Sequence, residues 1–292
     1  MATVAVIGAN GQLGCDLCDI FGAAGWEVVG VTHADLDVVD GDRVRAWVLG
    51  YRPAVVVNTA AFHNVEACEA DPLRAFRVNA VGARNVAEAC RQAESYLIHI
   101  STDYVFDGAK RTPYRETDLP LPLNVYGNTK LAGEYFVLSR QPMCAVVRTS
   151  GLYGMHPCRA KGCNFVELML RLASEKSQVR VVDDEVLTPT FTRDLARQIL
   201  RVAEKRSAMG VCHATSEGEC SWFEFAAAVF ELAGVEVLLQ RAGPGEFPHK
   251  APRPKYSVLE NMRLSSLGLN VMRHWKEALQ EYLAARSGRS DG

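Results

Sequence analysis

The sequence predicts an α/β fold, a Rossmann-type doubly wound parallel sheet with a smaller C-terminal substrate-binding lobe. In residues 1–150, short β-branched apolar runs alternate with longer amphipathic segments, which is typical of βαβ units. A glycine-rich turn follows the first apolar run directly. After Gly151 the apolar runs shorten and helical patterns dominate. We therefore predict one domain over residues 1–150 and a second lobe over residues 151–292, with some segments of the second part returning to the sheet.

Each expected element follows from apolar spacing and from its flanking residues. The expected strands are Thr3–Ile7, Glu27–Thr32, Ala54–Asn58, Tyr96–Ser101 and Ala145–Arg148. The expected helices are Gln12–Ala24, Asp42–Tyr51, Pro72–Ala93, Val125–Ser139, Asn164–Lys176, Thr192–Lys205, Ser221–Ala233 and His274–Ala285. Within Pro72–Ala93, the residues expected to face the sheet are Leu73, Phe76, Val78, Val81, Val86 and Ala89. A Pro-rich stretch runs from Pro244 to Pro254, and Ser287–Gly292 is expected to be a frayed tail.

Composition excludes several function classes. A chain of 292 residues with a net charge of −2 has no basic field for nucleic acid. No window of about twenty residues is continuously apolar, so no membrane span is expected. The nine cysteines, including Cys15, Cys18, Cys158 and Cys163, show no repeated spacing, which predicts reduced thiols in a cytoplasmic protein. With no H-E-x-x-H and no His/Cys cluster, and with His99 inside a strand, no catalytic metal is expected.

The first turn has the pattern of a dinucleotide-binding loop. The run Gly8-Ala9-Asn10-Gly11-Gln12-Leu13-Gly14 follows one strand and opens one helix. Glycines permit the tight turn and let the backbone approach a pyrophosphate, whose charge the helix N-terminus favours. We therefore expect Gly8, Asn10, Gly11, Gln12, Leu13 and Gly14 to border a nicotinamide cofactor.

The end of the second strand bears on the choice of cofactor. An acid at this point binds the ribose diol of NAD and repels the 2′-phosphate of NADP. The strand ends in Val31-Thr32-His33, with no acid until Asp35 and Asp37, although no Arg is present to hold a phosphate. The sequence therefore favours NADPH, with NADH possible, and places Thr32 in the cofactor site.

The segment Ile100–Lys130 has the pattern of a proton-transfer site. Thr102 ends an apolar run, and Tyr126 precedes Lys130 by four residues, so both lie on one face of the expected helix. An ammonium beside a phenol lowers the phenol pKa from about 10. Thr102 can bond the same substrate oxygen that Tyr126 protonates.

These motifs together resemble the extended short-chain dehydrogenase/reductase family. The resemblance covers nearly the whole chain, and it rests on the segments 8–14, 35–37, 57–61, 101–108 and 126–134, on Asn79, and on the later segments 148–150, 164–165, 188–190 and 253–254 with Trp275. It implies that Thr102, Tyr126 and Lys130 are catalytic and that Asp103 touches the sugar. It also implies a cofactor border that includes Asp37, Val38, Ala60, Ala61, Phe62 and Asn79.

The resemblance further implies NAD(P)H-dependent reduction of the C4 ketone of a nucleotide-linked 4-keto-6-deoxy sugar. In the second half of the chain, Asn164, Arg253 and Lys255 are the polar groups expected to hold a nucleotide diphosphate, and a solvated loop charge is the alternative for Arg253 and Lys255. The chain departs from the family at two positions, since Gly151 stands where a Trp is usual and Phe62 where a His is usual. A homodimer is possible.

Two alternatives remain open. A nucleotide-sugar epimerase or dehydratase shares the fold, but a 4,6-dehydratase is expected to have Glu after its Thr-Asp, where this chain has Tyr104. The chain could also be a non-catalytic NADP-binding regulatory subunit, like a relative that partners methionine adenosyltransferase. Retention of Thr102, Tyr126 and Lys130 favours an enzyme.

Overall fold

The computed structural model describes residues 1–157, 162–243, 246 and 251–290. In this part of the chain, six strands form one parallel sheet in the order β10-β5-β4-β3-β1-β2. These strands are β1 Thr3–Ile7, β2 Glu27–Val31, β3 Val55–Asn58, β4 Tyr96–Thr102, β5 Cys144–Thr149 and β10 Gly210–His213. The chain order reverses beside β1, whose neighbours are β2 and β3. The predicted α/β fold with a doubly wound parallel sheet is confirmed.

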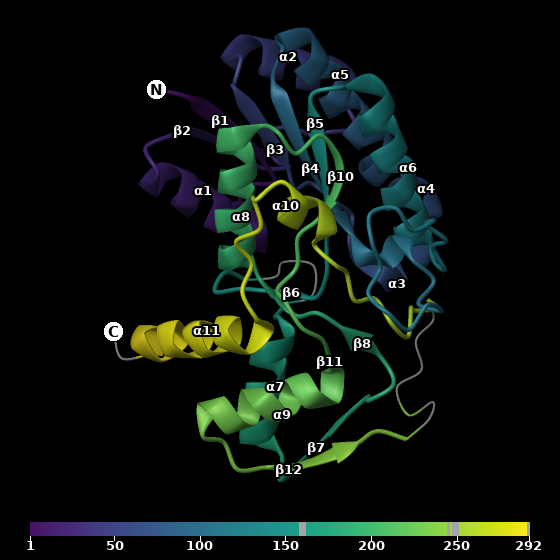
Figure 1. Ribbon diagram of the computed structural model, residues 1–292, viewed down its shortest axis with the longest axis vertical. Coiled ribbons are helices and arrows are strands. Elements are labelled where there is room, and N and C mark those ends of the chain that lie inside the picture. The colour runs from purple at the N-terminus through teal and green to yellow at the C-terminus, as the bar shows by residue number, and fades with distance from the viewer. Residues whose placement is uncertain (158–161, 244–245, 247–250, 291–292) are drawn as a thin grey trace.

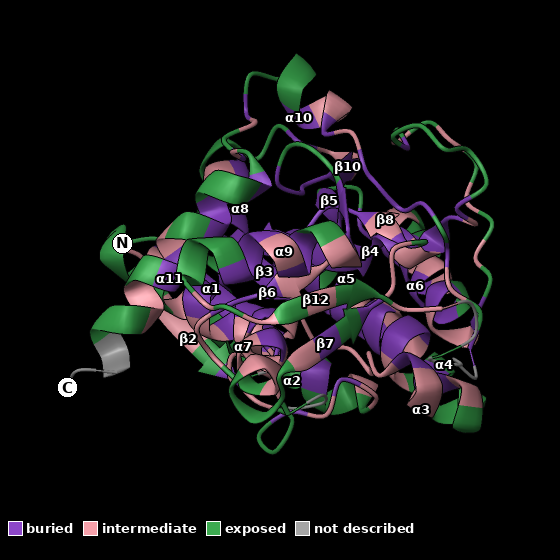
Figure 2. Cartoon of the chain, turned by 90° about the horizontal axis from the view of Figure 1, so that it is seen from below, coloured by how far each residue is buried: buried purple, intermediate pink, exposed green. Residues whose placement is uncertain are grey.

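Helices cover both faces of the sheet. On one face α1 (Gln12–Ala23) packs beside α8 (Thr192–Lys205), and on the other lie α2 (Gly41–Tyr51), α5 (Ala83–Ala93) and α6 (Val125–Arg140). Alternate strand residues serve the two faces, with Ile98 on the first and Leu97 on the second. Figure 2 shows the resulting burial along the central strands.

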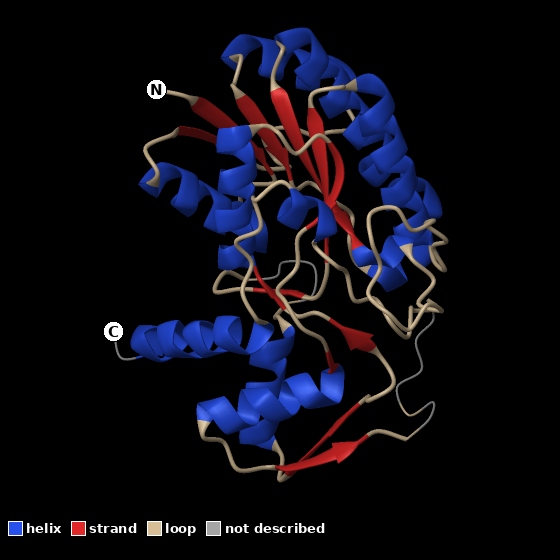
Figure 3. Cartoon of the chain, in the orientation of Figure 1, coloured by secondary structure: helices blue, strands red, loops and turns tan. Residues whose placement is uncertain are grey.

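A second lobe lies below the carboxyl ends of the strands (Figures 1 and 3). Its core is formed by α7 (Phe165–Glu175), α9 (Trp222–Ala233) and α11 (Trp275–Ser290), which pack with Tyr153 and Phe191. Short strands complete it: β6 Leu152–Tyr153 with β9 Thr190–Phe191, β7 Gln178–Val181 with β12 Leu238–Arg241, and β8 Val186–Leu187 with β11 Cys220–Ser221. The exact division of the chain at residue 150 stays a prediction, and α8, β10 and α10 (Met262–Ser266) pack with the large sheet.

The segment predicted as one helix over Pro72–Ala93 is divided. The structure has α4 (Pro72–Phe76), a π-helical turn (Arg77–Gly82) and then α5. The extra residue of the wider turn rotates the preceding helix, so the prediction that Leu73 and Phe76 face the sheet is wrong: their exposed fractions are 80% and 45%. Val86 and Ala89 are buried, as expected.

Two further expectations change at segment ends. A short helix, α3 (Val65–Ala70), follows β3 where the sequence predicted no helix, and Asn64 caps it through the Ala67 N–H. The expected frayed tail is wrong for residues 287–290, because α11 continues through them and the Ser287 hydroxyl bonds the Leu283 carbonyl. Residues 291–292, Cys158 and six residues of the Pro-rich stretch lie outside the described residues.

Candidate functional site

The β1–α1 turn is an open cradle at a helix N-terminus. Gly11 is the N-cap of α1, and no side chain caps the helix there. A Cβ on Gly14 would lie 2.1 Å from the Gly8 carbonyl oxygen, so only glycine permits this tight turn. A Cβ on Gly11 would meet only that same oxygen within 4 Å, so the outer side of the turn is open. Uncapped N–H groups beside open space fit a pyrophosphate.

The side chains that follow these glycines point into the protein. Leu13 is buried in the core, and Gln12 donates from Nε2 to the His156 carbonyl oxygen at 3.1 Å. The predicted cofactor contacts of Gln12 and Leu13 can therefore only involve their backbone N–H groups. Gln12 also joins α1 to the segment that follows β6.

The end of β2 carries charged groups of both signs. The Asp35 carboxylate accepts hydrogen bonds from the Thr32 N–H at 3.0 Å and from the Thr32 hydroxyl at 2.6 Å. These bonds lower the pKa of Asp35. The expectation that no Arg is present is wrong, because Arg43 of α2 reaches the Asp35 carbonyl oxygen at 2.9 Å. Arg43 lies eleven positions after Thr32 and becomes a neighbour only through the fold.

Two other predicted cofactor residues have structural partners. Val38 is buried, and a Cβ on Gly82 would lie 2.6 Å from its Cγ2, so Val38 packs against the π-helical turn. Asp37 accepts from the Val39 N–H at 3.0 Å. Any contact of Val38 with adenine therefore involves its backbone.

Asn79 positions the loop after β3. Its Oδ1 accepts from the Phe62 N–H at 2.8 Å, and its Nδ2 donates to the Phe62 carbonyl oxygen at 2.9 Å and to Thr129 Oγ1 at 3.0 Å. Since Asn79 is 1% exposed, it supports the cofactor side of the sheet by holding the loop that contains Ala60 and Ala61. Arg74 lies over the Phe62 ring at 4.8 Å.

The three residues predicted to be catalytic meet at the end of β4. Thr102 ends the strand, and its hydroxyl shares a hydrogen bond with the Tyr126 phenol at the start of α6. Lys130, one turn further along α6, donates from Nζ to the Ile100 carbonyl oxygen at 2.6 Å. A glycine is needed next to Tyr126, because a Cβ on Gly127 would lie 2.2 Å from the Tyr104 carbonyl oxygen.

The expected effect of Lys130 on Tyr126 is wrong in this structure. Burial raises the pKa of Tyr126, with smaller contributions from Asp103, Cys68 and Tyr104. The ammonium instead bonds a strand carbonyl, and burial lowers the pKa of Lys130 to about 8. Tyr126 is thus protonated at neutral pH, which is the state that a general acid requires.

Asp103 is enclosed by hydroxyl groups. Its Oδ1 accepts from Thr102 at 3.0 Å and its Oδ2 from Ser150 at 2.8 Å, while Ser257 also bonds the carboxylate. Burial raises the pKa of Asp103 against these bonds. The structure gives Asp103 a role in orienting Thr102, and its predicted contact with a sugar remains a prediction. The sequence did not single out Ser150 or Ser257 because they lie far along the chain.

A second tyrosine connects the catalytic group to Arg253. The Tyr104 ring lies edge-on to the Tyr126 ring at 5.9 Å, and its hydroxyl bonds Arg253. Arg253 also donates to Glu66 at 3.3 Å, while its buried Nε has no partner among the described residues. A partly exposed guanidinium fits the predicted role of Arg253 in binding an anionic substrate.

Asn164 has a different environment. It caps α7 by accepting from the Glu167 N–H at 3.0 Å, and its Nδ2 donates to Gly154 and to the Tyr282 hydroxyl. These bonds join three segments of the second lobe. They support a structural role, and substrate binding by Asn164 stays a prediction.

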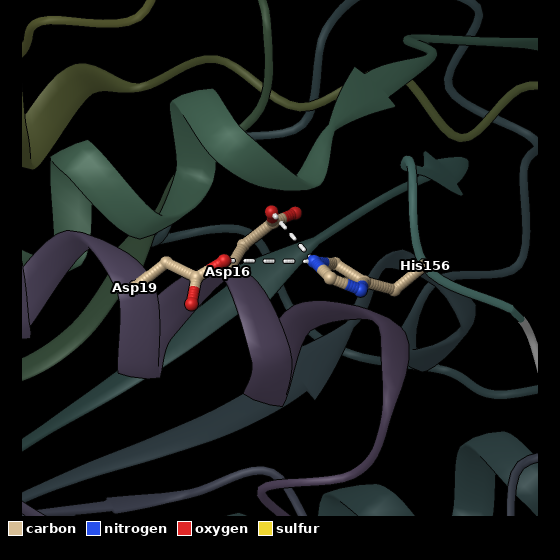
Figure 4. A group of neighbouring side chains, drawn as sticks. All are labelled: Asp16, Asp19 and His156. Carbon is tan, nitrogen blue, oxygen red and sulfur yellow. Dashed lines mark ion pairs between the residues drawn. The ribbon is translucent and has the colours of Figure 1, made fainter. Parts of the chain in front are cut away.

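Among the described residues, one group of His, Cys, Asp or Glu side chains is close enough to share an ion, namely Asp16, Asp19 and His156 (Figure 4). His156 Nε2 lies 3.7 Å from an oxygen of each aspartate. Asp16 also accepts from Thr192 at 2.5 Å. Asp16 and Asp19 belong to α1 and His156 follows β6, and the two ion pairs and this hydrogen bond account for the cluster.

Two further findings concern membrane-spanning helices and the state of the cysteines. No helix in the described part of the chain has the length and the apolar character that crossing a membrane requires. None of the eight described cysteines forms a disulfide. Burial raises the pKa of several of them, including Cys18 and Cys68 to about 11, which keeps these thiols protonated.

Comparison with known proteins agrees with this geometry. The chain is 41% identical to a dTDP-4-dehydrorhamnose reductase of Mycolicibacterium smegmatis, over 98% of this chain and 86% of that protein. It is 40% identical to the spore coat polysaccharide biosynthesis protein SpsK of Bacillus subtilis, over the full length of both. The crystal structure of a dTDP-4-dehydrorhamnose reductase from Bacillus anthracis in complex with NADP superposes with a TM-score of 0.93 at 36% identity, covering 98% of this chain and 100% of that one.

The crystal structure of a dTDP-4-dehydrorhamnose reductase from Clostridium acetobutylicum also gives a TM-score of 0.93, at 39% identity, covering 98% of this chain and 99% of that one. The family model described as "RmlD substrate binding domain" matches residues 2–287. Because this match spans almost the whole sequence, the chain belongs to the RmlD substrate-binding-domain family of the extended short-chain dehydrogenases/reductases.

Proposed function

We propose that the protein is an NADPH-dependent oxidoreductase that reduces the C4 ketone of a nucleotide-linked 4-keto-6-deoxy sugar, as its dTDP-4-dehydrorhamnose reductase relatives are named for doing. The observation that carries the proposal is the contact between the Thr102 hydroxyl and the Tyr126 phenol, with Lys130 one turn along the same helix. The relative of known structure that binds NADP supports the choice of cofactor. A nucleotide sugar is the proposed substrate, and a cytoplasmic homodimer remains a prediction.

Bound NADPH supplies the hydride. Tyr126 then donates its phenolic proton to the C4 oxygen, which would otherwise carry negative charge. Thr102 bonds the same oxygen when its hydroxyl proton turns away from Asp103 Oδ1, which accepts that proton in this structure. Lys130 contributes a positive charge next to the cofactor ribose. The partly exposed guanidinium of Arg253 holds the diphosphate of the substrate.

The test is NADPH oxidation with a panel of nucleotide 4-keto-6-deoxy sugars, starting with the dTDP sugar. We expect turnover of at least one member and a C4 alcohol as the product. Conversion between sugar epimers without net oxidation of NADPH would favour the epimerase alternative. Tight NADPH binding without turnover of any member would favour the regulatory-subunit alternative, and affinity capture with methionine adenosyltransferase would follow.

A further inference from the structure

A buried layer of polar side chains lies between the sheet and α6, directly behind Lys130. On β4, Ile98 and Ile100 face the helices α1 and α8, so His99 and Ser101 face α6. Strand register places Ser101 beside Arg148 of β5. Glu134 enters this layer from α6, one turn after Lys130. The layer therefore joins two neighbouring strands to the helix that carries the catalytic lysine.

Glu134 is the centre of the layer. Its Oε1 accepts from the Ser101 hydroxyl at 2.5 Å and from Arg148 Nε at 2.9 Å, and its Oε2 accepts from the Arg148 terminal nitrogen at 2.7 Å. The exposed fractions of the Glu134 and Arg148 side chains are 1% and 4%. A two-pronged pair in such surroundings has a fixed geometry.

Lys130 and Glu134 are attached to consecutive residues of one strand. Lys130 bonds the Ile100 carbonyl oxygen at 2.6 Å, and Glu134 bonds the side chain of Ser101. Because residues four apart on a helix lie on one face, Lys130 and Glu134 project from the same side of α6 towards β4. Glu134 is also the charged group that raises the pKa of Lys130 against the effect of burial.

We propose that Glu134 is a positioning residue for Lys130: fixed by Arg148 and Ser101, its carboxylate keeps the buried lysine charged and aimed at the cofactor. This inference rests on the proposed function and assigns a role to a residue that touches neither cofactor nor sugar. The other titratable groups facing Lys130 are Tyr126 on its own helix and His99 on β4, and burial lowers the pKa of His99 so that it stays neutral.

The test is the pH dependence of NADPH affinity, measured by cofactor fluorescence in wild type and Glu134→Gln. If the charged form of Lys130 binds the ribose, wild-type affinity falls as the pH rises through about 8, the pKa of Lys130. Removing the carboxylate lowers that pKa, so the loss of NADPH affinity in Glu134→Gln should begin at a pH at least roughly one unit below that of wild type. The alkaline limb of kcat with a turned-over sugar should move in the same direction. Glu134→Asp, which keeps the charge, should restore the wild-type position.

A substitution at another buried carboxylate separates a general loss of stability from the specific effect on Lys130. Asp194 of α8 accepts two hydrogen bonds from Arg273, at 2.8 and 3.0 Å, away from Lys130. Asp194→Asn should lower the melting temperature and leave the alkaline limb in place. If Glu134→Gln does not fold, the apolar pair Glu134→Met with Arg148→Met avoids an unpaired buried charge. Its shift should have the same direction but be smaller, because the positive charge of Arg148 is removed as well.

An alkaline limb that stays at the wild-type pH in folded Glu134→Gln, or in the apolar pair, would overturn the inference. The affinity curves need no sugar, so the inference is judged separately from the proposed function. A wild type that binds NADPH but reduces no sugar would count against the function alone.

Discussion

Tyr126 is partly exposed, and desolvation of its phenol by the surrounding residues is the main reason for its raised pKa. A partly desolvated phenol next to the Thr102 hydroxyl keeps its proton until a substrate oxygen gains negative charge. This arrangement favours ketone reduction, in which Tyr126 acts as an acid and returns to its neutral form from solvent between turnovers.

Substitutions at the catalytic residues should therefore separate their roles. Tyr126→Phe removes the proton donor and keeps the ring, so kcat should fall by ~10²–10⁴-fold while NADPH affinity persists. Lys130→Met should lose both turnover and NADPH affinity, because Lys130 is expected to bind the ribose. Thr102→Val should have a milder effect, since it removes one hydrogen bond. Steady-state kinetics and fluorescence titration provide the measurements, and wild-type turnover by Tyr126→Phe would require another proton source.

Lys130 also makes stability depend on pH. Its pKa is about 8 in the folded chain, whereas the ordinary value for a lysine in an unfolded chain is 10.5. Between these values the unfolded chain binds more protons than the folded chain, so the free energy of unfolding should rise with pH. Relative to Lys130→Met, wild type should gain up to about 3 kcal/mol between pH 8 and 10.5. Urea unfolding of both proteins across this range measures the difference, and parallel curves would contradict it.

At the scale of elements, helix α1 provides an uncapped N-terminus and the β1–α1 turn provides open space beside it. The local glycine pattern predicted this correctly because the turn is determined by residues adjacent in sequence. The end of β2 was predicted less completely, since Arg43 approaches it from the following helix.

Filling the open side of the turn should abolish cofactor binding. In Gly11→Val the branched side chain occupies the space beside the N-terminus of α1, while the φ of −79° at this position suits valine. We expect the melting temperature to stay close to wild type and NADPH binding to fall below detection by fluorescence titration. Unchanged affinity would remove the turn from the proposed site.

Arg43 should contribute to the choice of cofactor. The guanidinium can form a charge-assisted hydrogen bond to the 2′-phosphate, and exposure to solvent weakens that bond. Arg43→Ala should therefore weaken NADPH binding about tenfold and leave NADH binding unchanged. Thr32→Asp should shift the ratio further toward NADH. Wild-type catalytic efficiency with NADPH should equal or exceed that with NADH. A wild type strongly selective for NADH would show that Asp35 or Asp37 reaches the ribose.

Across the whole molecule, the sequence predicted five of the six strands in the described sheet, most of its flanking helices and the meeting of Thr102, Tyr126 and Lys130, because each depends on local periodicity and on parallel strands ending at one edge. It did not predict β10 as a strand. It did not predict contacts between distant segments, such as Ser150 with Asp103. It also missed the π-helical turn, since the six residues concerned have ordinary helical composition.

The pairing of β10 with β5 has a consequence for how the chain is made. These neighbouring strands are separated by the 60 residues 150–209, which include much of the second lobe. Until His213 has left the ribosome, the backbone groups of β5 have no partner on one side, and such an edge promotes association with other chains. The cofactor-binding half is therefore not an independently synthesised unit. A polypeptide ending near residue 150 should aggregate, and adding residues through the end of β10 supplies the strand that closes the sheet.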